Sequence, residues 1–102
     1  MNPRLAQALR SLSEGKPDAA RQTLTRALTS APSDPDLCNA MMLTLLRLGQ
    51  PEQALHFAQR ASTARPTDPT LHLNVGNCLG LLGRADDSEA PIRRALQLAP
   101  DL

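Results

Sequence analysis

The chain is almost free of aromatic residues. Of its 102 residues, none is Trp or Tyr, and Phe57 is the only Phe. A hydrophobic core must therefore be built from aliphatic side chains, chiefly Leu and Ala. The shortage of aromatic rings also argues against binding to single-stranded nucleic acid, because such binding uses rings as stacking platforms.

The chain also lacks an excess of charge of one sign. Its 11 Lys and Arg residues nearly balance its 10 Asp and Glu residues, and the formal net charge is +1. Lys16 is the only lysine. Nothing in this balance directs the chain to nucleic acid or to an anionic membrane, so we expect neither as a partner.

Long hydrophobic runs are absent. The longest apolar stretch, residues 41–48, is interrupted by Thr44 and Arg47 and is far too short to span a bilayer. The N-terminal residues open no apolar run of the signal-peptide type. We therefore expect a cytoplasmic protein.

Residues that bind metals or cofactors are few and scattered. Cys38 and Cys78 form no zinc or haem pattern, and we interpret both as reduced packing residues, with a redox role or a disulfide as the alternatives. His56 and His72 have no Cys or carboxylate at ligand spacing. We expect no metal and no cofactor.

The sequence repeats with a period of 34 residues, one third of its length. Four sets of identical residues recur at this spacing: Gly15, Gly49 and Gly83; Ala27, Ala61 and Ala95; Pro32, Pro66 and Pro100; Arg26, Arg60 and Arg94. A fixed period of this size indicates stacked supersecondary units. We predict one domain over residues 1–102, divided into repeats 1–34, 35–68 and 69–102.

Each period predicts two helices, and no window alternates long enough to predict a strand. Asn2, Asp34 and Asp68 each precede a Pro and are suited to cap a helix N-terminus, while the Gly column supplies residues that end a helix. The short connections predict antiparallel neighbours. The six predicted helices are 3–14, 17–30, 35–48, 51–64, 69–82 and 85–98.

Pro91 conflicts with the last of these helices. Pro lacks the N–H that would bond to the Asp87 carbonyl, and its ring crowds that carbonyl. Either the helix is distorted there, or it restarts at Ser88 with Pro91 in its first turn.

Helix pairs with this period, with Gly between the helices, Ala at packing positions and a Pro near the end, resemble the tetratricopeptide repeat. The third period matches best, in Asn74-Val75-Gly76, Leu79, Gly83, Ala95 and Pro100. The resemblance implies an all-α, right-handed superhelical stack of three antiparallel helix-turn-helix repeats. The chain departs from the family by lacking its usual aromatic residues, which predicts modest stability.

The end of the predicted stack has no C-terminal capping helix of the kind that family members often carry. Leu79, Leu82, Ile92 and Leu96 occupy positions that would normally touch such a helix. Left bare, they would form an apolar patch able to drive association. We hypothesise a homo-oligomer formed through this end, or an N-terminal segment of a larger protein.

The resemblance also implies a concave groove lined by the first helix of each repeat. A backbone-binding amide is implied for Asn74, and Asn39 and Asn77 are weaker candidates; the alternative is that these amides are merely solvated or cap local backbone. Arg47 is suited to hold a carboxylate, or is simply solvated. With Leu43 and Leu73, these residues favour a neutral or apolar extended peptide, or another copy of the chain, over an acidic tail.

These features favour a protein-protein interaction module that binds a partner protein or peptide in the groove. The alternative is a self-assembling or adaptor segment, for example one that precedes a transferase domain. We do not expect an enzyme, because no Ser/His/Asp or Cys/His set and no phosphate-binding Gly loop is present.

Overall fold

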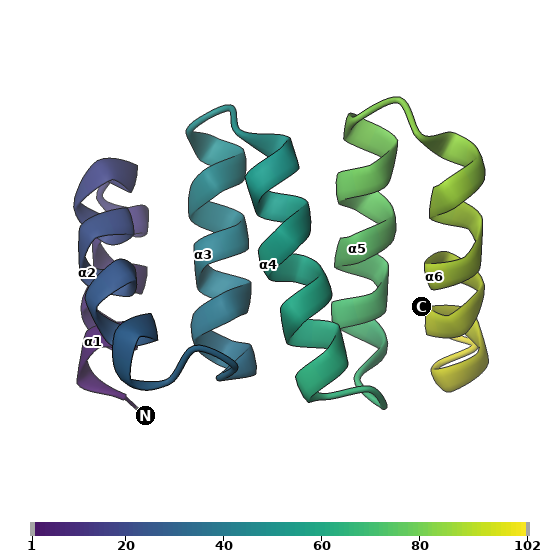
Figure 1. The fold of residues 1–102 in the computed structure, drawn as a ribbon, viewed down its shortest axis with the longest axis horizontal. Coiled ribbons are helices and arrows are strands. Elements are labelled where there is room, and N and C mark those ends of the chain that lie inside the picture. The colour runs from purple at the N-terminus through teal and green to yellow at the C-terminus, as the bar shows by residue number, and fades with distance from the viewer. Residues whose placement is uncertain (1, 102) are drawn as a thin grey trace.

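A computed structural model describes residues 2–101, and across these residues the chain forms six helices and no strand. They are α1 (Pro3–Ser13), α2 (Pro17–Ser30), α3 (Pro35–Arg47), α4 (Pro51–Ala64), α5 (Pro69–Leu81) and α6 (Ala85–Leu98). The helices follow one another along a single stack, with α1 and α2 at one end and α6 at the other (Figure 1). The predicted all-α class is confirmed. The division into repeats 1–34, 35–68 and 69–102 stays a prediction.

The predicted N-terminal caps are confirmed. Asn2 Oδ1 accepts hydrogen bonds from the backbone N–H of Arg4 at 2.8 Å and of Leu5 at 3.4 Å. Asp34 Oδ1 accepts from Asp36 and Leu37 in the same way. Each cap satisfies N–H groups that the first turn of a helix leaves without partners.

The turn after α3 shows why a Gly recurs at this place in the sequence. Gly49 has a φ of 73°, a left-handed conformation that Gly adopts without steric cost. Its N–H donates to the Leu46 carbonyl, and the N–H of Gln50 donates to the Leu45 carbonyl. This pair of bonds is a Schellman motif, and it turns the chain directly into α4.

The core is aliphatic, as the composition predicts. Its buried apolar side chains come from all six helices, with Ala95 as the one from α6, and they include Leu24, Leu37 and Met42. Thr44 is a buried polar residue beside them, and its hydroxyl donates to the Ala40 carbonyl at 2.8 Å. Cys38 and Cys78 are buried and free, so the interpretation as packing residues agrees with the structure and a disulfide between them does not.

Pro91 does not interrupt α6. The helix runs from Ala85 to Leu98 with Pro91 inside it, so the alternative of a restart at Ser88 is wrong. Ser88 instead lies in the first turn, and its hydroxyl donates to the Ala85 carbonyl at 2.6 Å. The carbonyl of Asp87 has no N–H partner four residues on, because that residue is Pro.

None of the helices in the described part of the chain is long and apolar enough to cross a membrane. Residues 2–101 also contain no group of three or more His, Cys, Asp or Glu side chains arranged to hold a metal ion.

Candidate peptide-binding groove

A cavity lies between α1 and α3, on the face where the groove is expected. Its volume is about 420 Å³. The lining residues are Asn2, Leu5, Leu9, Asp34, Asp36, Asn39, Ala40 and Leu43. Of the six groove residues predicted from the sequence, Asn39 and Leu43 line this cavity, and Leu73, Asn74, Asn77 and Arg47 do not.

The cavity lining combines apolar and polar groups. Leu5, Leu9 and Leu43 are apolar, and Leu9 and Leu43 are exposed although both are large aliphatic residues. Asn39 and Asp36 add polar groups beside them. A concave site with an apolar surface and a few polar groups is typical of small binding sites in proteins.

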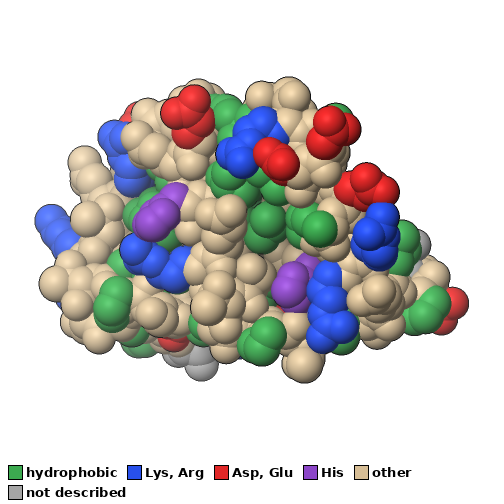
Figure 2. Space-filling model, turned by 45° about the vertical axis from the view of Figure 1, so that its right-hand side comes forward, with side chains coloured by type: hydrophobic (Ala, Val, Ile, Leu, Met, Phe, Trp, Pro, Cys, Tyr) green, Lys and Arg blue, Asp and Glu red, His purple; other side chains and the backbone are tan. Residues whose placement is uncertain are grey.

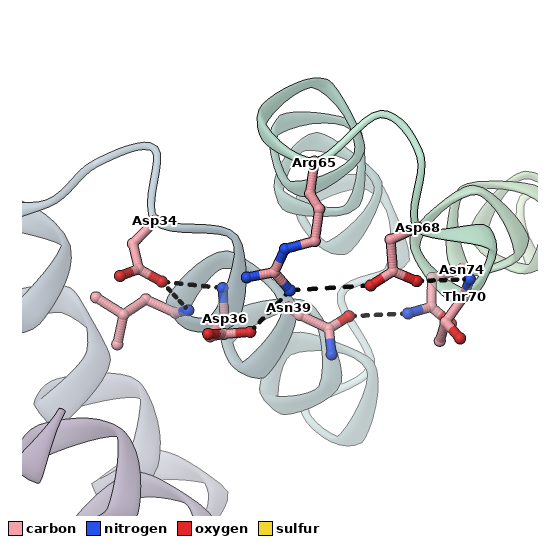
Figure 3. Close-up of polar contacts among 8 residues, drawn as sticks. Asp34, Asp36, Asn39, Arg65, Asp68, Thr70 and Asn74 are labelled. Atoms are coloured by element: carbon pink, nitrogen blue, oxygen red, sulfur yellow. Dashed lines mark hydrogen bonds and ion pairs between the residues drawn. The ribbon is translucent and has the colours of Figure 1, made fainter. Parts of the chain in front are cut away.

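Two of the predicted amides meet directly. Asn74 Nδ2 on α5 donates to Asn39 Oδ1 on α3 at 2.8 Å, and both side chains are half-buried (Figure 3). The bond uses only the oxygen of Asn39 and one N–H of Asn74. By itself it therefore leaves the Nδ2 group of Asn39 and the Oδ1 atom of Asn74 for other partners.

Arg65 lies near this amide pair, and sequence reasoning missed it. Its guanidinium donates to Asp36 Oδ1 at 3.1 Å and lies 3.8 Å from Asp68 Oδ2, so it joins the start of α3 to the cap of α5 (Figure 3). The hydrogen bond to Asp36 raises the pKa of Arg65 above its ordinary value, and the charges of both carboxylates act in the same direction. The sequence signals only the local half of this contact, because Arg65 and Asp68 are opposite charges three residues apart.

Arg47 makes a structural contact. Its Nη1 donates to the Leu12 carbonyl at 2.6 Å, an oxygen that also accepts from the Gly15 N–H at 3.1 Å in the turn after α1. The bond links α3 to α1. Within residues 2–101, the exposed Arg47 guanidinium forms no ion pair. Leu73 is half-buried and Asn77 is exposed on α5.

The apolar patch predicted at the end of the stack is smaller than expected. Leu79 is only 4% exposed, so the expectation that it is bare is wrong. Its equivalent one period earlier, Leu45, is 2% exposed, which shows that this position is buried whether or not another helix pair follows. Leu82 also packs partly against the core. Ile92 is half-buried, and Leu96 is 46% exposed.

The periodic pattern of the chain also matches a known family. The tetratricopeptide repeat model matches residues 11–73, which is more than half of the chain. The chain belongs to the tetratricopeptide repeat family. No curated protein matches the chain by sequence at a significant level.

Solved structures of tetratricopeptide repeat proteins share its fold. The Yersinia enterocolitica type III secretion chaperone SycD, in complex with a peptide of the translocator YopD, matches with a TM-score of 0.89 and 16% identity over 96% of this chain and 75% of that one. The second tetratricopeptide domain of Spaghetti (RPAP3), bound to the HSP90 peptide SRMEEVD, matches with a TM-score of 0.86 and 17% identity over 93% and 88%. At this identity the likeness establishes the fold.

A third match is to part of an enzyme. The O-GlcNAc transferase of Thermobaculum terrenum matches with a TM-score of 0.85 and 26% identity. The match covers 96% of this chain and only 19% of the transferase.

Proposed function

We propose that the chain is a protein-interaction module that holds an extended peptide in the groove along α1, α3 and α5. The observation that carries this proposal is the cavity between α1 and α3, where the exposed Leu9 and Leu43 lie beside the amide of Asn39. Two solved structures with this fold contain a bound peptide, which supports the same use of the fold.

In this proposal an apolar side chain of the peptide sits against Leu5, Leu9 and Leu43. Burying it removes apolar surface from water, worth about 25 cal/mol per Å². The amide of Asn39, held in place by Asn74, bonds to the peptide backbone, because an amide both donates and accepts.

The charges around the cavity favour a neutral peptide over an acidic one. Asp34 and Asp36 are part of the lining, and the neighbouring cation Arg65 is already paired with Asp36. A peptide carboxylate would therefore meet carboxylates with little compensating positive charge.

A display library of random peptides, selected on the wild-type chain, tests this function. We expect the selected peptides to be rich in apolar and neutral residues and to bind the Leu43→Asp variant at least about tenfold more weakly, measured by fluorescence anisotropy. Leu96→Asp is the matched control, because Leu96 is 46% exposed, against 41% for Leu43, lies on α6 outside the proposed groove and does not line the cavity. Equal binding to both variants would contradict the groove, and a predominantly acidic selection would contradict its preference for neutral peptides.

A second candidate function follows from the 26% identity to the O-GlcNAc transferase. In this alternative the chain is a non-catalytic arm that presents protein substrates to an enzyme domain. The reading frame after Leu102 tests it. A transferase domain encoded there supports the alternative, and an immediate stop codon contradicts it.

A further inference from the structure

The outer face of α6 differs from the corresponding faces of the earlier helices. Leu96 aligns with Leu28 two periods earlier, yet Leu96 is 46% exposed and Leu28 only 8%. Ile92 aligns in the same way with Leu24, which is fully buried. The helix α3 packs on α2, whereas no helix follows α6 within the described residues.

This surface, which we call the α6 face, forms a shallow depression of about 440 Å³. It is lined by Ala85, Ser88, Glu89, Ile92, Arg93 and Leu96. Figure 2 brings this end of the stack forward and shows apolar side chains interleaved with acidic and basic ones. The face is therefore amphipathic rather than purely apolar.

The opposite end of the stack is a poor partner for the α6 face. The buried residues Leu37, Met41 and Leu45 of α3 correspond, one period earlier, to Pro3, Gln7 and Ser11 of α1. These α1 residues present a short and mostly polar surface, with Pro3 and Gln7 exposed. Head-to-tail stacking of copies would therefore bury polar groups without replacing their water.

The charges on α6 are arranged so that the helix complements itself. The charged residues that line the α6 face are Glu89 in the first half of the helix and Arg93 in the second. Asp86, Asp87 and Arg94 do not line it, and Asp87 is paired with Arg84. A second α6 packed antiparallel would place Glu89 of each copy against Arg93 of the other. Parallel packing would instead place like charges together, which is unfavourable.

We propose that the α6 face binds a second copy of the chain through a twofold, antiparallel α6–α6 contact. Glu89 faces Arg93 of the partner subunit, which places Ile92 next to the twofold axis, and Leu96 becomes buried about 7.5 Å further along the same contact. In the single chain Glu89 and Arg93 bond to each other at 2.6 Å, with both side chains mostly exposed, so both are available to form a four-charge network. A twofold contact uses the same patch on both copies, as isologous interfaces do.

This contact leaves the groove on α1 and α3 open in both copies, because α6 lies at the far end of the stack (Figure 1). The dimer would present two grooves, and a ligand with two binding segments would gain affinity from their linkage. A single helix pair is a small interface, so the association is expected to be reversible and dependent on concentration.

Sedimentation equilibrium from micromolar to millimolar concentration tests the apolar part of the contact. We expect a monomer–dimer equilibrium, and we expect Leu96→Glu to raise the dimer dissociation constant at least about tenfold. Leu81→Glu is the matched control, because Leu81 is more exposed than Leu96 and lies on α5, away from the α6 face. A wild-type chain that stays monomeric throughout, or a dimer equally sensitive to both variants, overturns the proposal.

Charge reversal tests the antiparallel arrangement. Glu89→Arg and Arg93→Glu should each weaken self-association at least about tenfold, because each places like charges across the twofold axis. An equimolar mixture of the two variants should restore association as a heterodimer, with circular dichroism confirming that both remain folded. Single variants that dimerise as tightly as the wild type, or a mixture that stays monomeric, contradict the arrangement.

Discussion

Asn74 Nδ2 donates to Asn39 Oδ1 at 2.8 Å, across the contact between α5 and α3. The two residues are 35 positions apart, one more than the period. The bond therefore joins two successive helix pairs, and its two residues do not occupy equivalent positions in the repeat. It fixes the orientation of both amides on the face proposed to bind a peptide, and this pre-organisation lowers the entropy lost on binding.

A double-mutant cycle measures this bond. Asn39→Ala and Asn74→Ala should each lower the free energy of unfolding, and their coupling should be about 0.5–1.5 kcal/mol, as for other half-buried neutral hydrogen bonds. Urea denaturation gives the four values. Asn77→Ala is the control, because Asn77 is exposed on the same helix, and it should change stability by less than about 0.5 kcal/mol. A coupling near zero would show that the bond is not formed in solution.

Arg47→Ala should destabilise the stack even without a ligand. The variant loses the bond from Arg47 to the Leu12 carbonyl, which links α3 to the end of α1, and we expect a loss of about 1 kcal/mol. The control is Arg94→Ala on the exposed surface of α6, which should be close to neutral. Thermal denaturation gives the melting temperatures of both variants. Equal melting temperatures for Arg47→Ala and Arg94→Ala would mean that the Arg47 side chain is simply solvated.

Gly76→Ala should have opposite effects on the stability of the wild type and of an Ile92→Ala variant. A Cβ at this position would lie 2.5 Å from Ile92 Cγ1, so Ala should destabilise the wild type by about 1–3 kcal/mol. In an Ile92→Ala background that obstacle is gone, and the better helix propensity of Ala should add about 1 kcal/mol.

Gly80→Ala is the control for this pair of measurements. A Cβ at Gly80 meets nothing within 4 Å, so it should stabilise both backgrounds by a similar amount. If Gly76→Ala has the same sign in both backgrounds, then Ile92 does not limit the approach of α5 and α6.

Stability should fall above pH 9 because of the two cysteines. Burial raises the pKa of both thiols above the ordinary value of 9.0. Above that pH the unfolded chain loses thiol protons that the folded chain keeps, so unfolding becomes more favourable as pH rises towards the folded pKa. Near pH 7, well below 9.0, both states keep these protons and the contribution is constant.

The composition makes this effect measurable. The chain has no Tyr and only Lys16 as a lysine, so few other groups titrate in this range. A Cys38→Ala/Cys78→Ala variant should be less stable at pH 7 because it loses packing, but its stability should depend less on pH between 8 and 10. Equal slopes in urea denaturation for both chains would contradict the assignment.

The period predicts the fold well because it repeats the local signals that begin and end helices. Asn2 and Asp34 cap helices in the structure, and Gly49 has the left-handed conformation that the turn requires. Predicted and observed helix ends differ by one residue where Glu14, Leu48 and Leu82 are caps rather than helical residues. Such local contacts depend only on nearby sequence.

The site was harder to predict because its contacts join distant residues. Arg65 pairs with Asp36 across 29 positions, and Arg47 reaches Leu12 across 35. The partners of such long side chains depend on how the helices pack. The period does not tell which way each side chain points. The burial of Leu79 was missed for a related reason, because its position alone does not tell whether α6 or a following helix covers it.

The central claim is that the face of α1 and α3 binds an extended peptide, and amide chemical shifts test it most directly. The 15N-labelled chain is titrated with a peptide selected from the display library. We predict that the largest shifts fall on Leu5, Leu9, Asn39 and Leu43, with small shifts on α2, α4 and α6. Shifts concentrated on α6 or spread over α2 and α4, with those four residues unchanged, would contradict the account.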